Sequence, residues 1–178
     1  MPSAIGLRFY QISIRQKGSS QPLEFESDEL ATPVQKFIAE YVKKNSSAIQ
    51  SKELERSWYF DIQESDKLKN CRGYVHYGTF GFESNFVDSR TKARNYRRKI
   101  TDVEEIPLYF EFWSPPSETF GFVGFQSFQG RSCINLVMSG LKEAFENENQ
   151  GSRLYTKRYF QPMQRPAFLE KHRSNAFA

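Results

Sequence analysis

Apolar and polar residues alternate along several short segments of the chain, which is the pattern of half-buried β-strands. In residues 7–15, one set of alternate positions is apolar and includes Tyr10, Ile12 and Ile14. Gly78 and Gly81 lie in a later strand-like segment and predict a bulge or a bend there. Further strands are expected at residues 58–63, 73–82, 108–113, 120–128 and 153–160.

Two other segments have apolar residues at the spacing of an amphipathic helix. The apolar stripe recurs every three or four positions in residues 32–45 and again in residues 132–146. Each segment begins with a hydroxyl residue, Thr32 or Ser132, which we expect to cap the first helical turn. The stripe residues are Val34, Phe37, Ile38, Tyr41, Val42, Ile134, Val137, Met138, Leu141 and Phe145.

Residues 86–100 predict a β-hairpin whose polar loop, residues 89–95, is longer than a tight two-residue turn. After it, residues 102–106 predict a brief helical turn, and Pro107 opens the next strand. Because the strands follow one another without crossover helices, an antiparallel or mixed sheet is favoured. We therefore predict an α+β fold with a mostly antiparallel or mixed sheet of about seven strands and two helices packed on one face.

The length of 178 residues fits one domain. We expect residues 1–160 to form it and residues 161–178 to be a polar tail that begins a further C-terminal region. Cys71 and Cys133 are too few for a disulfide framework or a four-ligand zinc site. The chain begins without a signal-peptide pattern and has no run of about 18 apolar residues. These features predict a cytoplasmic protein that does not cross a membrane.

The distribution of charge along the sequence is uneven, because the cations are clustered. The net charge is only +4, but residues 88–101 contain six cations and one carboxylate, and residues 153–173 contain six cations and one carboxylate. Aromatic residues lie within or beside both stretches. Cations among flat rings are suited to a phosphate backbone with stackable bases. The alternative is that both stretches are simply solvated.

These stretches predict a nucleic-acid site, for DNA or RNA, on the hairpin and the last strand. The cations would neutralise phosphates and the tyrosines would stack on bases. The predicted residues are Arg90, Lys92, Arg94, Tyr96, Arg97, Arg98, Lys99, Arg153, Tyr155, Lys157 and Arg158. A weaker anion site is predicted at Gly130, Arg131 and Ser132, between a strand and a helix; there, a turn and a helix cap are the favoured explanation.

Familiar catalytic motifs are missing from the sequence, including the glycine-rich phosphate loop and the Gly-x-Ser-x-Gly elbow. His76 lies alone in a strand, where a structural role is the favoured explanation. Asp61, Glu64 and Glu111 are the acids that could hold Mg²⁺ in a nuclease. The strand after Glu111 lacks the acid-x-Lys pattern of such sites, so this alternative ranks low. We predict no catalytic residue, metal or cofactor.

Four segments resemble poorly characterised bacterial proteins of phage-defence and mobile-element loci. They read Gly-Thr-Phe-Gly-Phe-Glu-Ser-Asn-Phe-Val-Asp (78–88), Tyr-Arg-Arg-Lys (96–99), Asp-Val-Glu-Glu-Ile-Pro-Leu-Tyr-Phe (102–110) and Gly-Phe-Val-Gly-Phe-Gln-Ser-Phe-Gln-Gly (121–130). The resemblance covers half of the chain and defines no catalytic residue. It implies a bacterial, cytoplasmic protein that is part of, or a small partner of, a defence effector.

Together these observations favour a non-enzymatic nucleic-acid-binding accessory or sensor module in a bacterial defence context. The second hypothesis is a subunit that binds a protein effector or itself, because aromatic residues and Arg are also enriched at protein interfaces. The metal-dependent nuclease is the third.

Overall fold

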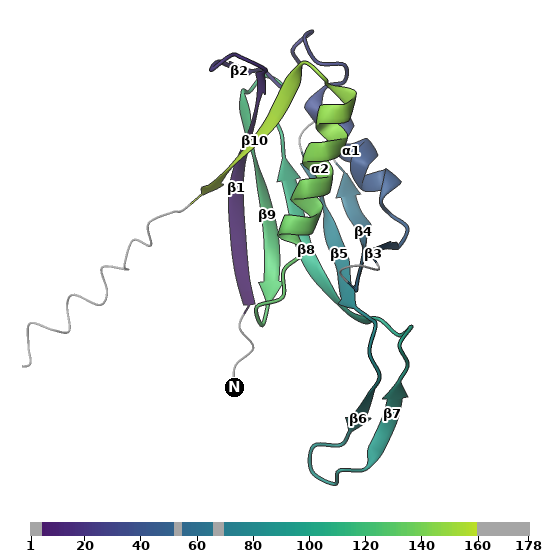
Figure 1. Ribbon diagram of the computed structural model, residues 1–178. Helices are drawn as coiled ribbons and strands as arrows, with labels where there is room; N and C mark the ends of the chain where they lie inside the picture. Colours follow the sequence, from purple (N-terminus) through teal and green to yellow (C-terminus); the bar gives the residue numbers. More distant parts are fainter. Residues whose placement is uncertain (1–4, 52–54, 66–69, 160–178) are drawn as a thin grey trace, which may run out of the picture.

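The computed structural model describes residues 5–51, 55–65 and 70–159. In this part of the chain, one large sheet is covered by two helices, and a small two-stranded sheet extends away from it (Figure 1). The strands of the large sheet are β1 (Ile5–Gln16), β2 (Pro22–Leu23), β3 (Ile49–Ser51), β4 (Arg56–Ser65), β5 (Asn70–Thr79), β8 (Glu104–Trp113), β9 (Phe120–Phe128) and β10 (Ser152–Tyr159).

The strand order across the large sheet is β10-β1-β9-β8-β5-β4-β3, with β2 paired to β1. Every pairing is antiparallel. The small sheet consists of β6 (Ser84–Val87) and β7 (Arg94–Arg98), also antiparallel. The structure thus confirms the predicted α+β class. The two strands that sequence patterns missed, β2 and β3, are only two and three residues long. Alternation of apolar and polar residues cannot be recognised over so few positions.

Both predicted helices are present, as α1 (Val34–Lys44) and α2 (Ile134–Glu148), and both lie over the same face of the sheet (Figure 1). All ten residues of the predicted apolar stripes are buried. The N-cap residues are Pro33 and Cys133, so the predicted Thr32 cap is wrong. Ser132 is not the N-cap residue either, although its Oγ accepts a hydrogen bond from the N–H of Ile134, the first residue of α2, at 3.5 Å. In α1 the first free N–H, that of Val34, instead donates to the carbonyl oxygen of Phe25 at 2.9 Å.

The core between the sheet and the helices is built largely from phenylalanine. Phe37 of α1 meets Phe145 of α2 edge-on, with ring centroids 5.2 Å apart. On the sheet, Phe60 and Phe110 approach to 4.9 Å in the same edge-on manner. Such edge-to-face pairs add to the free energy gained from burial. Seven of the 17 phenylalanines are buried in this core: Phe25, Phe37, Phe60, Phe110, Phe112, Phe125 and Phe145.

Two local predictions are wrong. Residues 102–106 do not form a helical turn, because Glu104 and the residues after it pair with β5 as the start of β8. Pro107 is tolerated inside β8 because β9 pairs with β8 only from Phe110 onward, so the missing N–H falls at an open edge. Gly78 also stays in regular register instead of forming a bulge; a Cβ there would lie 2.8 Å from the carbonyl oxygen of Glu104. The predicted bend is present at Gly81, which has φ of 98°.

Leu141 provides a direct test of this core, because its side chain is fully buried in α2. Replacing Leu141 with Ala should lower the free energy of unfolding by about 2–5 kcal/mol, since it leaves a cavity between helix and sheet. Ser139→Ala, on the exposed side of the same helix, should change it by less than about 0.5 kcal/mol. Chemical denaturation of both variants measures the difference. Equal changes in the free energy of unfolding would show that the apolar stripe of α2 does not stabilise the core.

Candidate nucleic-acid interface

The hairpin formed by β6 and β7 extends from one end of the large sheet, between the end of β5 and the start of β8 (Figure 1). Five of its six predicted phosphate-binding cations are exposed: Arg90, Lys92, Arg94, Arg97 and Lys99. The sixth, Arg98, is only 2% exposed, so its predicted role on the surface is wrong.

Arg98 is buried because its guanidinium joins the hairpin to the large sheet. It donates to the carbonyl oxygen of Thr79 at the end of β5, and its Nε donates to the carbonyl oxygen of Asp102 at 3.3 Å. Its Nη1 lies 3.2 Å from Oε2 of Glu104. The guanidinium carbon also lies 4.0 Å from the centre of the Phe82 ring. Three nitrogen donors of one guanidinium thus connect the hairpin to β5, to β8 and to the segment before β8.

Replacing Arg98 with Leu should loosen the base of the hairpin, because the carbonyl groups of Thr79 and Asp102 lose their partners. We expect the free energy of unfolding to fall by about 1–3 kcal/mol. Hydrogen exchange should accelerate in β6 and β7 more than in the helices. Arg97→Leu is the matched control, since Arg97 is exposed and pairs with Glu83 at 2.8 Å. Similar losses in both variants would contradict the anchoring role.

The tip of the hairpin is held in a defined turn by Asp88. Its Oδ1 accepts hydrogen bonds from the backbone N–H of Thr91 at 2.7 Å and of Arg90 at 3.0 Å, and from the Thr91 hydroxyl. Lys92 adopts the left-handed region with φ of 61°, and its N–H donates to the carbonyl oxygen of Asp88. The bonds from Thr91, and then from Arg90, lower the pKa of Asp88. The three tip cations therefore project from an ordered loop.

Protonation of the Asp88 carboxylate should destabilise this turn. Because the folded-state pKa of Asp88 is lowered, the turn is favoured above the unfolded pKa of about 3.9 and is lost as the pH falls through the still lower folded value. The amide signals of Arg90 and Thr91 in NMR spectra should therefore titrate below about pH 3.9. In Asp88→Asn that titration should disappear. Titration of the wild-type signals at or above the ordinary value would contradict the role of Asp88.

Two aromatic side chains, Phe86 and Tyr96, lie on one face of the hairpin. The rings of Phe86 and Tyr96 are neighbours, with centroids 6.1 Å apart, and each is about half exposed. The Tyr96 hydroxyl donates to Asp102, which raises the pKa of Tyr96 and contributes to lowering that of Asp102. The largest cause of the lowered Asp102 pKa is the hydrogen bond from the backbone N–H of Lys99. Tyr96 is thus fixed at its hydroxyl while its ring stays accessible.

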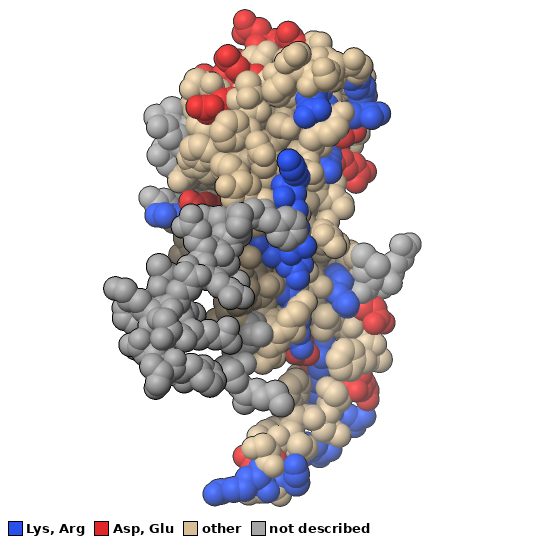
Figure 2. Space-filling model, turned by 90° about the vertical axis from the view of Figure 1, so that its left-hand side faces the viewer, with Lys and Arg blue, Asp and Glu red and all other residues tan. Residues whose placement is uncertain are grey.

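Of the second predicted stretch, residues 153–173, the structure describes 153–159, which belong to β10, and the rest lies outside the described residues. Strand β10 is at the opposite edge of the sheet from β3, and β1 and β9 separate it from β8. Arg153, Tyr155 and Lys157 lie on the face without helices, whereas Arg158 lies on the helix side of the strand. Figure 2 looks toward this edge and shows Lys and Arg side chains in a column down the middle and again at the hairpin tip. The two stretches are therefore separate surfaces on one side of the molecule.

The face of the sheet without helices has an uneven charge that the sequence analysis did not reveal. Strands β1, β9 and β10 contain no Asp or Glu, but they contain five cations, of which Arg15, Arg153 and Lys157 lie on this face. The carboxylates of the sheet are in β4 and β8, among them Asp61, Glu105 and Glu111 on the uncovered face, while β5 between these strands contains Arg72 and no carboxylate. This division depends on which strands become neighbours, so it is invisible in any single segment.

The predicted anion site at Gly130, Arg131 and Ser132 has a different local role. Gln129 and Gly130 form a turn with φ of 48° and 81°, between the paired residues Phe128 and Arg131. The guanidinium of Arg131 lies 2.5 Å from a carboxylate oxygen of Glu104. A phosphate at this turn would have to compete with Glu104.

Two of the acids considered for catalysis, Asp61 and Glu111, are engaged by neighbours, whereas the side chain of Glu64 lies outside the described residues. His76 stacks on Tyr59 and lies 2.7 Å from Glu105 through Nδ1, while Asp61 is 3.8 Å from its Nε2. Glu111 accepts a hydrogen bond from the hydroxyl of Tyr109 at 2.9 Å. The strand β5 lies between Asp61 and Glu111. In the described part of the chain, no group of three or more His, Cys, Asp or Glu residues is arranged to hold a metal ion.

The cysteines are buried, and burial raises the pKa of Cys71 to about 11 and that of Cys133 to about 12. Both thiols are therefore protonated at neutral pH, and neither is a nucleophile in this state.

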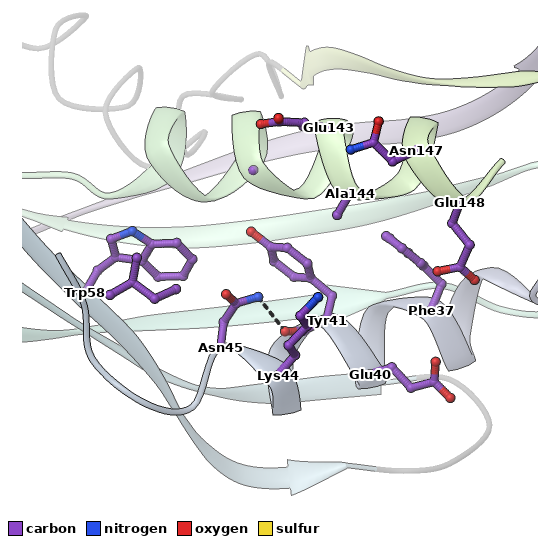
Figure 3. A pocket seen from close by; sticks show the side chains of 12 residues that line it. Phe37, Glu40, Tyr41, Lys44, Asn45, Trp58, Glu143, Ala144, Asn147 and Glu148 are labelled. Carbon is purple, nitrogen blue, oxygen red and sulfur yellow. Dashed lines mark hydrogen bonds between the residues drawn. The ribbon is translucent and has the colours of Figure 1, made fainter. Parts of the chain in front are cut away.

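A groove of about 780 Å³ lies between α1 and α2. Phe37 and Tyr41 point from α1 toward α2, where Ala144 faces them (Figure 3). Burial, and then the charge of Glu143, raise the pKa of Tyr41 to about 12. Three carboxylates line the groove, those of Glu40, Glu143 and Glu148. Because carboxylates repel phosphates, this groove is not part of the candidate interface.

No protein-family model, curated protein sequence or solved structure matches the chain. Neither α1 nor α2, the helices of the described residues, has the length and apolar character needed to cross a membrane.

Proposed function

We propose that this chain is a nucleic-acid-binding module whose main electrostatic contact is the hairpin tip. The observation that carries this proposal is the ordered turn at Asp88, which presents Arg90, Lys92 and Arg94 away from the body of the protein. The resemblance to defence-locus proteins supports an accessory or sensor role beside an effector in a bacterial cell.

The free charge of the hairpin is smaller than its cation count suggests. Arg98 is neutralised in the interior by Glu104, and Arg97 pairs with Glu83 at the surface. Arg90, Lys92, Arg94 and Lys99 have no ion-pair partner among the described residues. Each of these four can neutralise a phosphate and release its condensed counterion, which makes binding favourable and dependent on salt.

A protein-binding subunit is the second candidate, because the hairpin also exposes large apolar side chains. Phe86, Val87, Tyr96 and Ile100 are each close to half exposed or more. Exposed apolar patches of this kind are typical of interfaces. Salt distinguishes the two functions, since an apolar interface responds little to salt and a phosphate-binding surface responds strongly.

The experiment compares the wild type with a triple variant, Arg90→Ala, Lys92→Ala and Arg94→Ala. Fluorescence anisotropy with labelled single-stranded and double-stranded DNA and RNA, over a series of salt concentrations, measures affinity and its salt slope. We expect the triple variant to bind at least about tenfold more weakly at low salt, with the slope reduced by about two to three units. Competition with unlabelled heparin should displace all of these probes.

The matched control removes three cations elsewhere: Lys36→Ala, Lys43→Ala and Lys44→Ala, all exposed on α1. This variant has the same net charge as the tip variant and should keep most of the affinity and the slope. Equal weakening in both variants would show a response to net charge alone. If the wild type binds none of the probes at low salt, the proposed function is wrong and the protein-binding alternative takes its place.

A further inference from the structure

The uncovered face of β1, β9 and β10 is an aromatic surface. Strand alternation places Phe9, Phe120, Phe122, Tyr155 and Tyr159 on this face, away from the helices. The register aligns them across the sheet, with Phe9 opposite both Tyr159 and Gly124. We call this surface, with its cations, the cationic half-face.

Four rings on the uncovered face form one cluster. Phe122 is at the centre, with centroid distances of 5.4 Å to Tyr159, 5.8 Å to Phe120 and 5.9 Å to Trp113 of β8. The ring of Phe9 lies over Gly124, where a Cβ would be only 2.9 Å from Cε1 of Phe9. Gly124 therefore lets Phe9 lie close to the sheet. Phe9 remains 46% exposed and Tyr159 49% exposed, so the cluster presents accessible rings.

Three cations lie along the β10 side of this cluster. Arg15 and Arg153 are directly opposite each other in the β1–β10 pairing, and Lys157 is opposite Gln11. The guanidinium carbon of Arg15 lies 5.0 Å from the centre of the Tyr155 ring. None of these three has a carboxylate partner among the described residues. Rings and cations thus alternate along one edge of an acid-free half of the sheet.

The neighbouring half of the same face contains several carboxylates, with one exposed cation, Arg72 of β5, among them. Glu111 in β8 is directly opposite Gly124, and Asp61 and Glu105 lie further across the sheet. A phosphate backbone is attracted to the β10 side and repelled from the β4 side. The charge pattern therefore defines a path for a polyanion along β10 and β1, with flat rings beside it.

We propose that the cationic half-face binds single-stranded nucleic acid, with bases stacked on the cluster around Phe122 and phosphates along Arg15, Arg153 and Lys157. This assignment rests on the proposed function and specifies the form of its ligand. The bases of a duplex are stacked on each other and cannot reach rings on a sheet, whereas unpaired bases can. The rise along a strand separates Tyr155 and Tyr159 by about 13 Å. Aromatic side chains on the smaller sheets of known RNA-binding modules stack about two or three bases.

A second copy of the chain is a poorer occupant of this surface. A twofold interface places the same patch on both partners. Arg15, Arg153 and Lys157 would then meet the same cations of the partner with no carboxylate in strands β1, β9 and β10 to offset them. Like charges brought together in this way oppose association.

The test uses a 12-nucleotide single strand that contains 2-aminopurine, and a duplex of the same sequence. The fluorescence of 2-aminopurine falls when the base stacks on an aromatic ring. We expect the single strand to bind at least about tenfold more tightly than the duplex, with quenching on binding. Replacing Tyr155 and Tyr159 with Ala should weaken single-strand binding by about ten- to a hundredfold and remove much of the quenching.

Two control variants separate stacking from other effects. Tyr159→Phe keeps the ring and should retain the quenching. Tyr74→Ala removes an exposed tyrosine from the acidic half of the face and should leave single-strand binding unchanged. Circular dichroism and thermal unfolding confirm that each variant is folded.

Each remaining outcome overturns a distinct claim. If the single strand and the duplex bind equally and without quenching, this inference is wrong while the function of the hairpin stands. If no probe binds, the proposed function itself is wrong. If the Tyr155 and Tyr159 variants change the mass of the protein in light scattering but not its affinity for the single strand, the half-face is a contact between two copies of the chain.

Discussion

The two helices cover only one face of an antiparallel sheet, and this constraint determines where every functional group can lie. Side chains alternate between the faces of a strand, so each strand sends half of its residues into the phenylalanine core and half to the uncovered face. In β1, Ile12 and Ile14 are buried on the helix side, whereas Phe9 and Arg15 lie on the uncovered face. A shift of one residue in register would exchange these sets and expose the core. The same hydrophobic burial that fixes the register therefore also fixes the aromatic and cationic surface.

The hairpin depends on a second constraint, the burial of a charge at its base. Removing a guanidinium from water is costly unless its donors find acceptors, and Arg98 meets that requirement with two backbone carbonyl oxygens, a carboxylate of Glu104 and the face of Phe82. Because these partners come from β5, β8 and the connecting segment, their geometry restricts the direction in which the hairpin leaves the sheet. Asp88 performs a similar task at the tip with the N–H groups of Arg90 and Thr91. The exposed cations lie between two points that are fixed by hydrogen bonds.

Sequence patterns predicted the elements whose formation depends on many residues. They failed where a single contact determines the local structure. The stripes of α1 and α2 and the alternation of β1 and β9 were sufficient for the α+β class, because burial imposes them over many positions. Arg97 and Arg98 are indistinguishable in sequence, but alternation turns one to solvent and the other to the body of the protein. The acid-free half of the sheet could not be predicted, since it requires β10 and β9 to become neighbours of β1 across long stretches of chain. The predicted Thr32 cap failed for a similar reason, as the loop at Phe25 supplies the acceptor for the N–H of Val34.

The hairpin tip and the cationic half-face can contribute different kinds of free energy to one ligand. Exposed cations act through counterion release and steering, which are independent of sequence and weaken as salt rises. Rings on a sheet act through stacking, which needs unpaired bases but tolerates salt better. Because β9 and β1 separate β8 from β10, charges on the hairpin are largely screened from the half-face when their distance exceeds the Debye length of about 8 Å in physiological salt. The two surfaces therefore reinforce each other only through a ligand long enough to span both, and the gain then depends on effective concentration instead of on direct contact between them.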